Sequence, residues 1–164
     1  MKQTILKLTL ILFLFCSWTF VKAQNLTPRE MLSIHNIQST QSINEILSEK
    51  GFDPGETYRN VNSKETITNW NFKPFVDSGD EISSSLTRTV DTLQKTKTYF
   101  VLYNPYNYKD FINSLTKSKF KFQGMRVIND KNYSVFKYKK TTCLATERQL
   151  DGIRSYFEIV FETE

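Results

Sequence analysis

The amino-acid sequence predicts an α+β fold of two tandem halves, in each of which a helix or helix pair precedes an antiparallel β-meander of three to four strands. The apolar spacing changes twice from a helical period to strand-like alternation. In addition, INEILSEKGF (43–52) aligns with FINSLTKSKF (111–120), and both segments have a leucine and a closing phenylalanine at the same places. Together these observations favour an internal duplication.

Residues 1–23 are predicted to be a removable secretory signal peptide. The segment has two lysines before an apolar core at 8–15, and Val21 and Ala23 are small residues at the positions that a signal peptidase recognises. We therefore expect cleavage between Ala23 and Gln24 and export to the periplasm or the medium.

Two alternatives would leave the chain attached to a membrane. An uncleaved signal could act as an anchor, although its apolar core is shorter than the roughly 20 residues that span a bilayer. Cys16 could be lipidated, although the large Phe15 precedes it where that modification prefers a small residue. No later segment is apolar enough to predict a transmembrane helix.

Removing residues 1–23 from the 164 leaves 141 residues, and the net charge falls from +5 to +2. We divide this part into halves at 24–104 and 105–164, packed as one compact domain over 24–164. Cys143 is its only cysteine, so no intramolecular disulfide can form. An exported chain without disulfides, rich in Lys, Asn, Ile and Tyr, is typical of bacteria.

The first half begins with two predicted helices. Thr27 can cap the first helix and Glu30 can complete a capping box, with Pro28 at the first helical position. A second helix is expected at 42–50, and Gly51 is suited to end it.

Strands are expected after a turn at 53–55. The third of them also fits helical spacing, so strand and helix both remain open for it. The expected strands are 58–61, 65–72, 82–92 and 98–103.

The second half begins with the clearest helix, which Asn107 can cap. Tyr108, Phe111, Ile112 and Leu115 follow at helical spacing. Three strands are expected next, at 120–128, 132–140 and 153–162. The apolar phase changes around Gly124, which predicts a β-bulge there.

The order of elements, together with the helix, Lys50-Gly51-Phe52 and strand run, resembles small exported α+β proteins of the beta-lactamase-inhibitor-protein-like and SmpA/OmlA-like group. It is also similar to exported proteins of low-GC Gram-negative bacteria. The resemblance would cover most of 26–163, and it implies binding of another protein rather than catalysis. The chain departs from the inhibitor family because it lacks that family's disulfides.

The sequence offers little chemistry for catalysis, a metal or a cofactor. His35 is its one histidine, expected to lie at the surface or half-buried on the first helix. Cys143 is expected to be an apolar filler at the end of a strand. Asp77, Asp80 and Glu81 could surround calcium, but their spacing matches no EF-hand. Paired carboxylates of a hydrolase would meet only in space, so sequence alone leaves that class open.

The charge is unevenly distributed along the chain. Residues 95–140 carry ten lysines and Arg126 against two aspartates, a net charge of +9, and tyrosines are interleaved among them. Such a stretch can attract an anionic partner. A second interpretation is structural, because Glu158 and Glu162 on the last strand could neutralise lysines on a neighbouring strand. Specific nucleic-acid binding is not expected, since the stretch holds a single arginine.

These features predict an exported, non-enzymatic binding protein of the bacterial envelope that recognises another protein or an anionic envelope component. The alternatives are a small secreted hydrolase using paired carboxylates and a structural component of the envelope. The candidate binding residues belong to the second meander and the loop before its helix: Tyr103, Tyr106, Tyr108, Lys121, Arg126 and Lys137.

Overall fold

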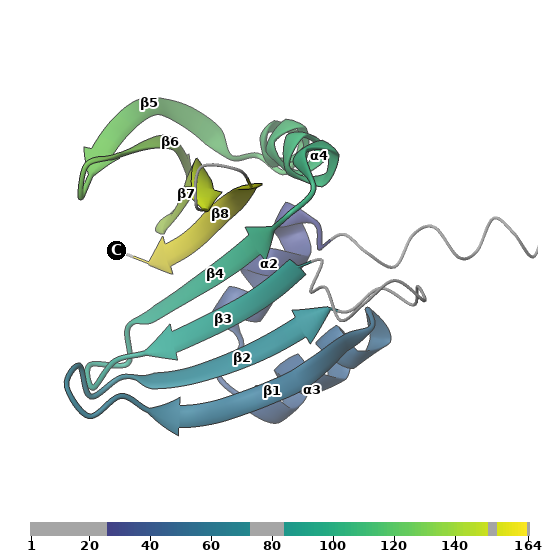
Figure 1. Cartoon of the computed structure of the whole chain (residues 1–164), viewed down its shortest axis with the longest axis vertical. Coiled ribbons are helices and arrows are strands. Elements are labelled where there is room, and N and C mark those ends of the chain that lie inside the picture. Colours follow the sequence, from purple (N-terminus) through teal and green to yellow (C-terminus); the bar gives the residue numbers. More distant parts are fainter. Residues whose placement is uncertain (1–25, 73–83, 151–153, 164) are drawn as a thin grey trace, which may run out of the picture.

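The computed structural model describes residues 26–72, 84–150 and 154–163. Two helices and four strands come first, and a helix and four strands follow (Figure 1). The first set is α2 (Pro28–Asn36), α3 (Thr40–Glu49), β1 (Phe52–Arg59), β2 (Thr66–Phe72), β3 (Ser84–Val90) and β4 (Thr96–Leu102). The second set is α4 (Pro105–Lys117), β5 (Lys121–Ile128), β6 (Lys131–Tyr138), β7 (Thr141–Leu150) and β8 (Arg154–Thr163).

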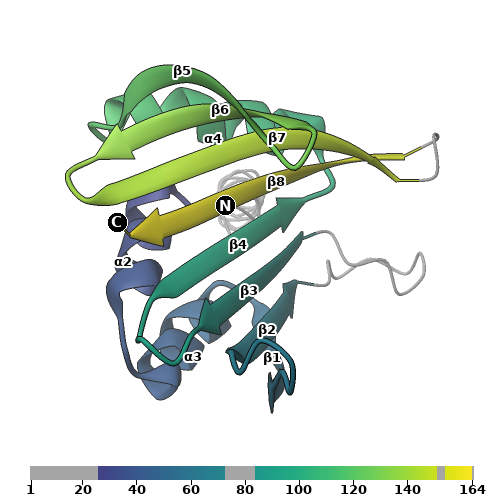
Figure 2. The same cartoon turned by 90° about the vertical axis from the view of Figure 1, so that its left-hand side faces the viewer.

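All eight strands belong to one antiparallel sheet with the order β1-β2-β3-β4-β8-β7-β6-β5, seen from edge to edge in Figure 2. The mixed α+β class is therefore confirmed. The expected division into two tandem halves is not confirmed, because the second meander continues the sheet of the first through the β4–β8 pair.

The described helices lie on one side of this sheet, which we call the helix-covered face (Figures 1 and 2). Strand alternation sends every second side chain into the layer between helices and sheet. Trp70, Leu86, Phe100 and Ile159 are fully buried there, and the indole N–H of Trp70 donates to Asn44 Oδ1 of α3 at 2.7 Å. We call the opposite side the open face.

The helix starts follow local capping chemistry. The capping box of α2 is confirmed: Thr27 N donates to Glu30 Oε2 at 2.7 Å, and Glu30 N donates to Thr27 Oγ1 at 3.3 Å. The expected cap of α4 was wrong. Asn104 caps it, accepting from Tyr106 N at 2.8 Å, because Pro105 fits the first helical position and lets the helix begin earlier than Asn107.

The first meander differs from expectation at its edge. β1 begins at Phe52, whereas a turn was expected at 53–55. The register shifts between Pro54 and Thr57, and this irregularity on an edge strand accommodates a proline that donates no hydrogen bond. The open question at 82–92 is settled as strand for Ser84–Val90, which pairs with β2 and β4. The possible calcium residues Asp77, Asp80 and Glu81 lie outside the described residues.

The second meander has four strands, where the sequence predicted three. Thr141–Leu150 is a separate strand, β7, and not the end of the strand before it. Lys139 has a positive φ of 54° and turns the chain between β6 and β7. Because β7 intervenes, β6 and β8 are not neighbours.

The bulge expected at Gly124 is present. The β5–β6 register shifts between Phe122 and Gly124, and Gly124 has a φ of 105°. Backbone in this region favours glycine, whereas a Cβ there is strained even though it would meet no atom within 4 Å.

We expect Gly124→Ala to lower the free energy of unfolding by about 1–2 kcal/mol, because alanine must adopt a positive φ without any gain in packing. Gln123→Ala is the matched control, since its backbone φ is not positive. Urea denaturation of both variants measures the difference. Equal stabilities would contradict the account of the bulge.

Candidate functional site

The structure divides the six predicted binding residues between the two sides of the sheet. Register places Lys121 opposite Lys137, and Arg126 opposite Tyr133, all on the open face. Tyr103 follows β4, and its ring centroid lies 6.3 Å from that of Tyr156 on β8.

The other two predicted residues lie on α4, on the helix-covered side. Tyr108 stacks on Phe157 with ring centroids 4.4 Å apart, and burial raises the pKa of its phenol. Tyr108 therefore holds α4 against the sheet. Tyr106 is 77% exposed at the start of α4 and does not join the residues of the open face.

The strand expected to neighbour Glu158 and Glu162 was wrong, although Lys97 of the basic stretch does pair with Glu162. Glu158 and Glu162 were expected to pair with lysines of the strand that is now β6, but β7 separates β6 from β8. Glu158 instead pairs with Arg148 of β7, and Glu162 Oε2 lies 3.8 Å from Lys97 Nζ of β4. In the described part of the chain, neither Lys121 nor Arg126 has an ion-pair partner.

A cluster of three side chains lies next to Arg126, whose register partner Tyr133 belongs to it. Arg148 Nη2 bonds Glu158 Oε1 and donates to the Tyr133 hydroxyl at 2.9 Å, and that hydroxyl donates to Glu158 Oε1 at 3.1 Å. The side chains of Arg148 and Glu158 are 22% and 13% exposed. We call these residues the Arg148 cluster. Because each member bonds both others, their positions on the open face are tightly constrained.

The open face has a small apolar cluster of its own. Tyr133, Val135, Leu144 and Val160 are buried together, with Tyr99 and Ile128 packed against them. Burial of Tyr99 raises the pKa of its phenol, and the nearby negative charge of Glu158 raises it further. The face therefore combines a packed apolar centre with charged and phenolic groups, a composition typical of binding surfaces.

Sequence analysis did not find the Arg148 cluster. The detectable signal was the run of β-branched and apolar residues TTCLAT at 141–146, whose first four residues were interpreted as the end of the preceding strand. Without β7, Arg148 had no place in the sheet, so its pairing with Glu158 could not be inferred.

We expect Glu158→Gln to lower the free energy of unfolding by about 2 kcal/mol, because it leaves the half-buried Arg148 without its counter-charge. Glu162→Gln is the control, since its partner Lys97 is 50% exposed and such pairs contribute about 0–1 kcal/mol. Urea denaturation measures both variants. An equal loss in the two would contradict the structural role of the Arg148 cluster.

His35 is buried, and not at the surface or half-buried as expected: its residue exposure is 2%. Its Nδ1 lies 3.0 Å from Thr98 Oγ1 and its Nε2 lies 2.8 Å from Thr163 Oγ1. Burial, with a smaller contribution from the positive charge of Arg88, lowers its pKa from 6.5 to about 4. His35 is therefore neutral at pH 7, with both nitrogens engaged by threonine.

Cys143 also lies in the core. It is fully buried on β7, opposite Phe136 and Phe161, and burial raises the pKa of its thiol. Neither ring nitrogen of His35 bonds Cys143, so the two do not form a nucleophile and base.

The neutral state of His35 predicts a pH dependence of stability. As the pH falls below 6.5, the unfolded imidazole takes up a proton, whereas the folded one does so only near pH 4. The free energy of unfolding should therefore decrease over this range, by at most about 1.4 kcal/mol per pH unit.

Urea titrations between about pH 5 and pH 6.5 test this above the usual range of carboxyl groups. His35→Gln should reduce the slope of stability against pH, whatever its effect on absolute stability. Parallel slopes for the two proteins would contradict burial of the neutral imidazole.

A groove of about 620 Å³ lies beside the N-terminal part of α4, lined among others by Tyr108, Met125, Asp130 and Glu147. Both of these acids are exposed. Nearby, β5 exposes Phe122, Met125 and Val127 by 56%, 69% and 66%. Their register places these apolar side chains on the helix-covered side of the edge strand.

Within the described residues there is neither a cluster of metal ligands nor a membrane-spanning helix. No three His, Cys, Asp or Glu side chains within 26–72, 84–150 and 154–163 are grouped as metal ligands would be. Among the helices of those ranges, none has the length and apolar character needed to cross a membrane.

Comparison with known proteins gave no match to a family model, a curated protein or a solved structure.

Proposed function

We propose that this chain is an exported bacterial binding protein that recognises an acidic partner protein through the β5–β8 part of its open face. The observation that carries the proposal is that Arg126 lies beside Tyr133 of the Arg148 cluster, with Lys121 exposed on the same face of β5. The two cations are exposed and have no ion pair in the described ranges. They can therefore attract and contact negative charge on a partner.

A protein is favoured as the partner because of the surface chemistry. Tyrosine and arginine are the residue types that dominate binding energy at protein interfaces, and Tyr103, Tyr133, Tyr156 and Arg148 adjoin one another on this face. They lie on or next to paired strands, so little conformational entropy is lost when a partner binds. An anionic component of the envelope is the second possible partner.

Export and duplication form part of the same proposal. Residues 1–23 have the composition of a cleavable signal, and retention by that segment or by lipidated Cys16 is the alternative. The strand order supports a duplication, because two four-strand meanders each begin at an outer edge and meet at β4 and β8. Residues 24–104 and 105–164 would then be two copies of one ancestral unit within a single domain.

The hydrolase and the structural component remain alternative proposals. A hydrolase would need two carboxylates converging in a cleft, and Asp130 and Glu147 both line the groove beside α4. A structural component would remain with the membrane or cell-wall fraction when cells are fractionated.

A polyanion of known chemistry tests the proposed surface. Lys121→Gln with Arg126→Gln should weaken binding of fluorescent poly-L-glutamate about tenfold at low salt, because the mutated cations belong to the contact surface. Fluorescence anisotropy gives the affinities, and circular dichroism confirms that the fold is kept.

Lys109→Gln with Lys117→Gln is the control, since it removes the same charge from exposed positions on α4. This variant should bind poly-L-glutamate nearly as well as the parent. An equal loss in both double variants would show that net charge alone governs binding. Binding to anionic phospholipid vesicles but not to poly-L-glutamate would instead favour an envelope component.

A further inference from the structure

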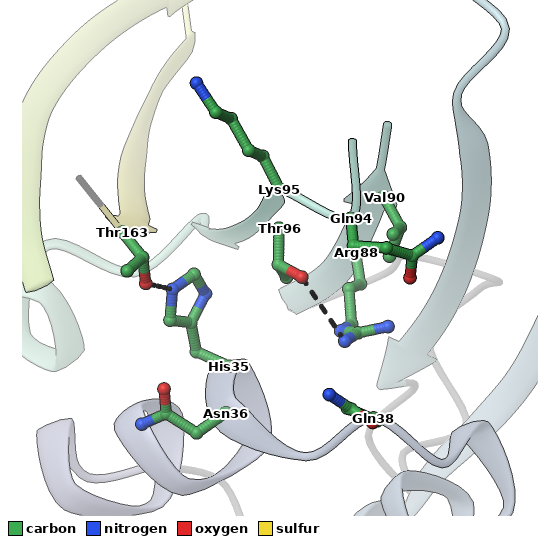
Figure 3. A pocket seen from close by; sticks show the side chains of 9 residues that line it. All are labelled: His35, Asn36, Gln38, Arg88, Val90, Gln94, Lys95, Thr96 and Thr163. Carbon is green, nitrogen blue, oxygen red and sulfur yellow. Dashed lines mark hydrogen bonds between the residues drawn. The ribbon is translucent and has the colours of Figure 1, made fainter. Parts of the chain in front are cut away.

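A separate pocket of about 310 Å³ lies where the C-terminal end of α2 meets β3, β4 and the end of β8 (Figure 3). Eight of its nine lining residues have polar side chains. The lining residues are His35, Asn36, Gln38, Arg88, Val90, Gln94, Lys95, Thr96 and Thr163. None of them carries a carboxylate side chain, and two are cationic.

Arg88 is the unusual member of this set. It is 8% exposed and lies on the helix-covered face of β3, where its register neighbours are Thr68 and Thr98. Its Nη2 donates to the carbonyl oxygen of Ile37 at 2.8 Å and to Thr96 Oγ1 at 3.5 Å, while its Nε is buried without a hydrogen-bond partner. Within the described residues no carboxylate pairs with this guanidinium.

The positive charge of Arg88 is therefore not neutralised by the described residues. A buried cation normally has a counter-charge, because its desolvation costs several kcal/mol when it stays unpaired. The carbonyl of Ile37, the C-cap of α2, compensates in part, since a helix C-terminus carries partial negative charge. A carbonyl dipole does not neutralise a full charge, and an arginine does not lose its proton at neutral pH.

We propose that this pocket binds a small oxyanion, the carboxylate or phosphate group of a small polar molecule, with Arg88 as its central cation. In Figure 3 the guanidinium lies between Gln38 and Thr96 on the pocket wall. The guanidinium fork matches the geometry of carboxylate and phosphate oxygens. The site lies on the helix-covered side, so it is distinct from the open face and independent of the proposed partner binding.

His35 and Lys95 complete the site in different ways. His35 is held between Thr98 and Thr163, so its ring forms a neutral wall of the pocket. The ammonium of Lys95 points away from Arg88 in Figure 3, and the residue is exposed. A flexible lysine at this position can approach a bound anion without being buried in its absence.

Thermal unfolding of the purified protein with sodium phosphate or sodium succinate, against sodium chloride at equal ionic strength, tests the proposal. A ligand that binds only the folded state raises Tm with its concentration. We expect a saturable rise with at least one probe, and the probe that acts identifies a phosphate or carboxylate site. No rise above the chloride control with either probe would overturn the proposal.

Variants then locate the binding. Arg88→Gln should raise the Kd of the active probe at least about tenfold, whereas Arg59→Gln, which removes an exposed cation on β1, should leave it unchanged. Retained binding in Arg88→Gln would overturn the site.

Because Arg88→Gln could fail to fold, Gln38→Glu provides a second route. A carboxylate beside the guanidinium should raise Tm without any ligand and abolish the response to the probe. An unchanged response in this variant would equally overturn the proposal.

One further variant separates an external ligand from the side-chain carboxylate of Glu164. Glu164 follows the pocket residue Thr163 in the sequence and lies outside the described residues. Glu164→Gln should respond to the probe as the parent does. A response confined to Glu164→Gln would mean that the chain supplies its own anion, and the external ligand would be excluded.

Discussion

The pairing of β4 with β8 is the contact on which the rest of the structure depends. It joins two four-strand meanders into one sheet, and its central residues Phe100 and Ile159 lie opposite each other and are fully buried. Phe100 contacts Phe111 of α4, and Phe111 contacts Phe161 of β8, so one short stretch of strand positions the third helix as well. If the two strands separated, each meander would expose half of a shared core.

The described helices cover one side of the sheet, so within the described residues the open face is stabilised without a helix layer. The Arg148 cluster and the small apolar cluster around Val135 and Leu144 meet this need. Pairing Glu158 with Arg148 also has a consequence for function: it removes Glu158 as a partner for the lysines of β5 and β6. Lys121 and Arg126 on β5 have no ion-pair partner among the described residues, because the acids of β8 are engaged by β7 and β4.

Local chemistry made much of the fold predictable from sequence. The capping box of Thr27 and Glu30 and the phase change at Gly124 each involve neighbours in the chain, and both were located correctly. The sequence did not reveal β7 as a separate strand, and this omission changed which strands were expected to be adjacent. Which strands are neighbours depends on contacts between residues distant in sequence. The omission of one strand therefore changed the expected partners of Glu158 and Glu162. The burial of His35 was hidden for the same reason, since its partners Thr98 and Thr163 lie 63 and 128 residues away.

The helix-covered side shows how differently two basic side chains respond to burial. The imidazole of His35 can lose its proton at little cost in free energy, and its two nitrogens then form hydrogen bonds with threonine hydroxyls. The guanidinium of Arg88 has no such option, because its pKa, although burial lowers it, starts too high for the proton to be lost. An uncompensated buried charge is costly, so a gain in folding stability does not explain an arginine in such a place. A charge retained beside a polar pocket, with no acid supplied by the described chain, is better explained by an anion that arrives from outside.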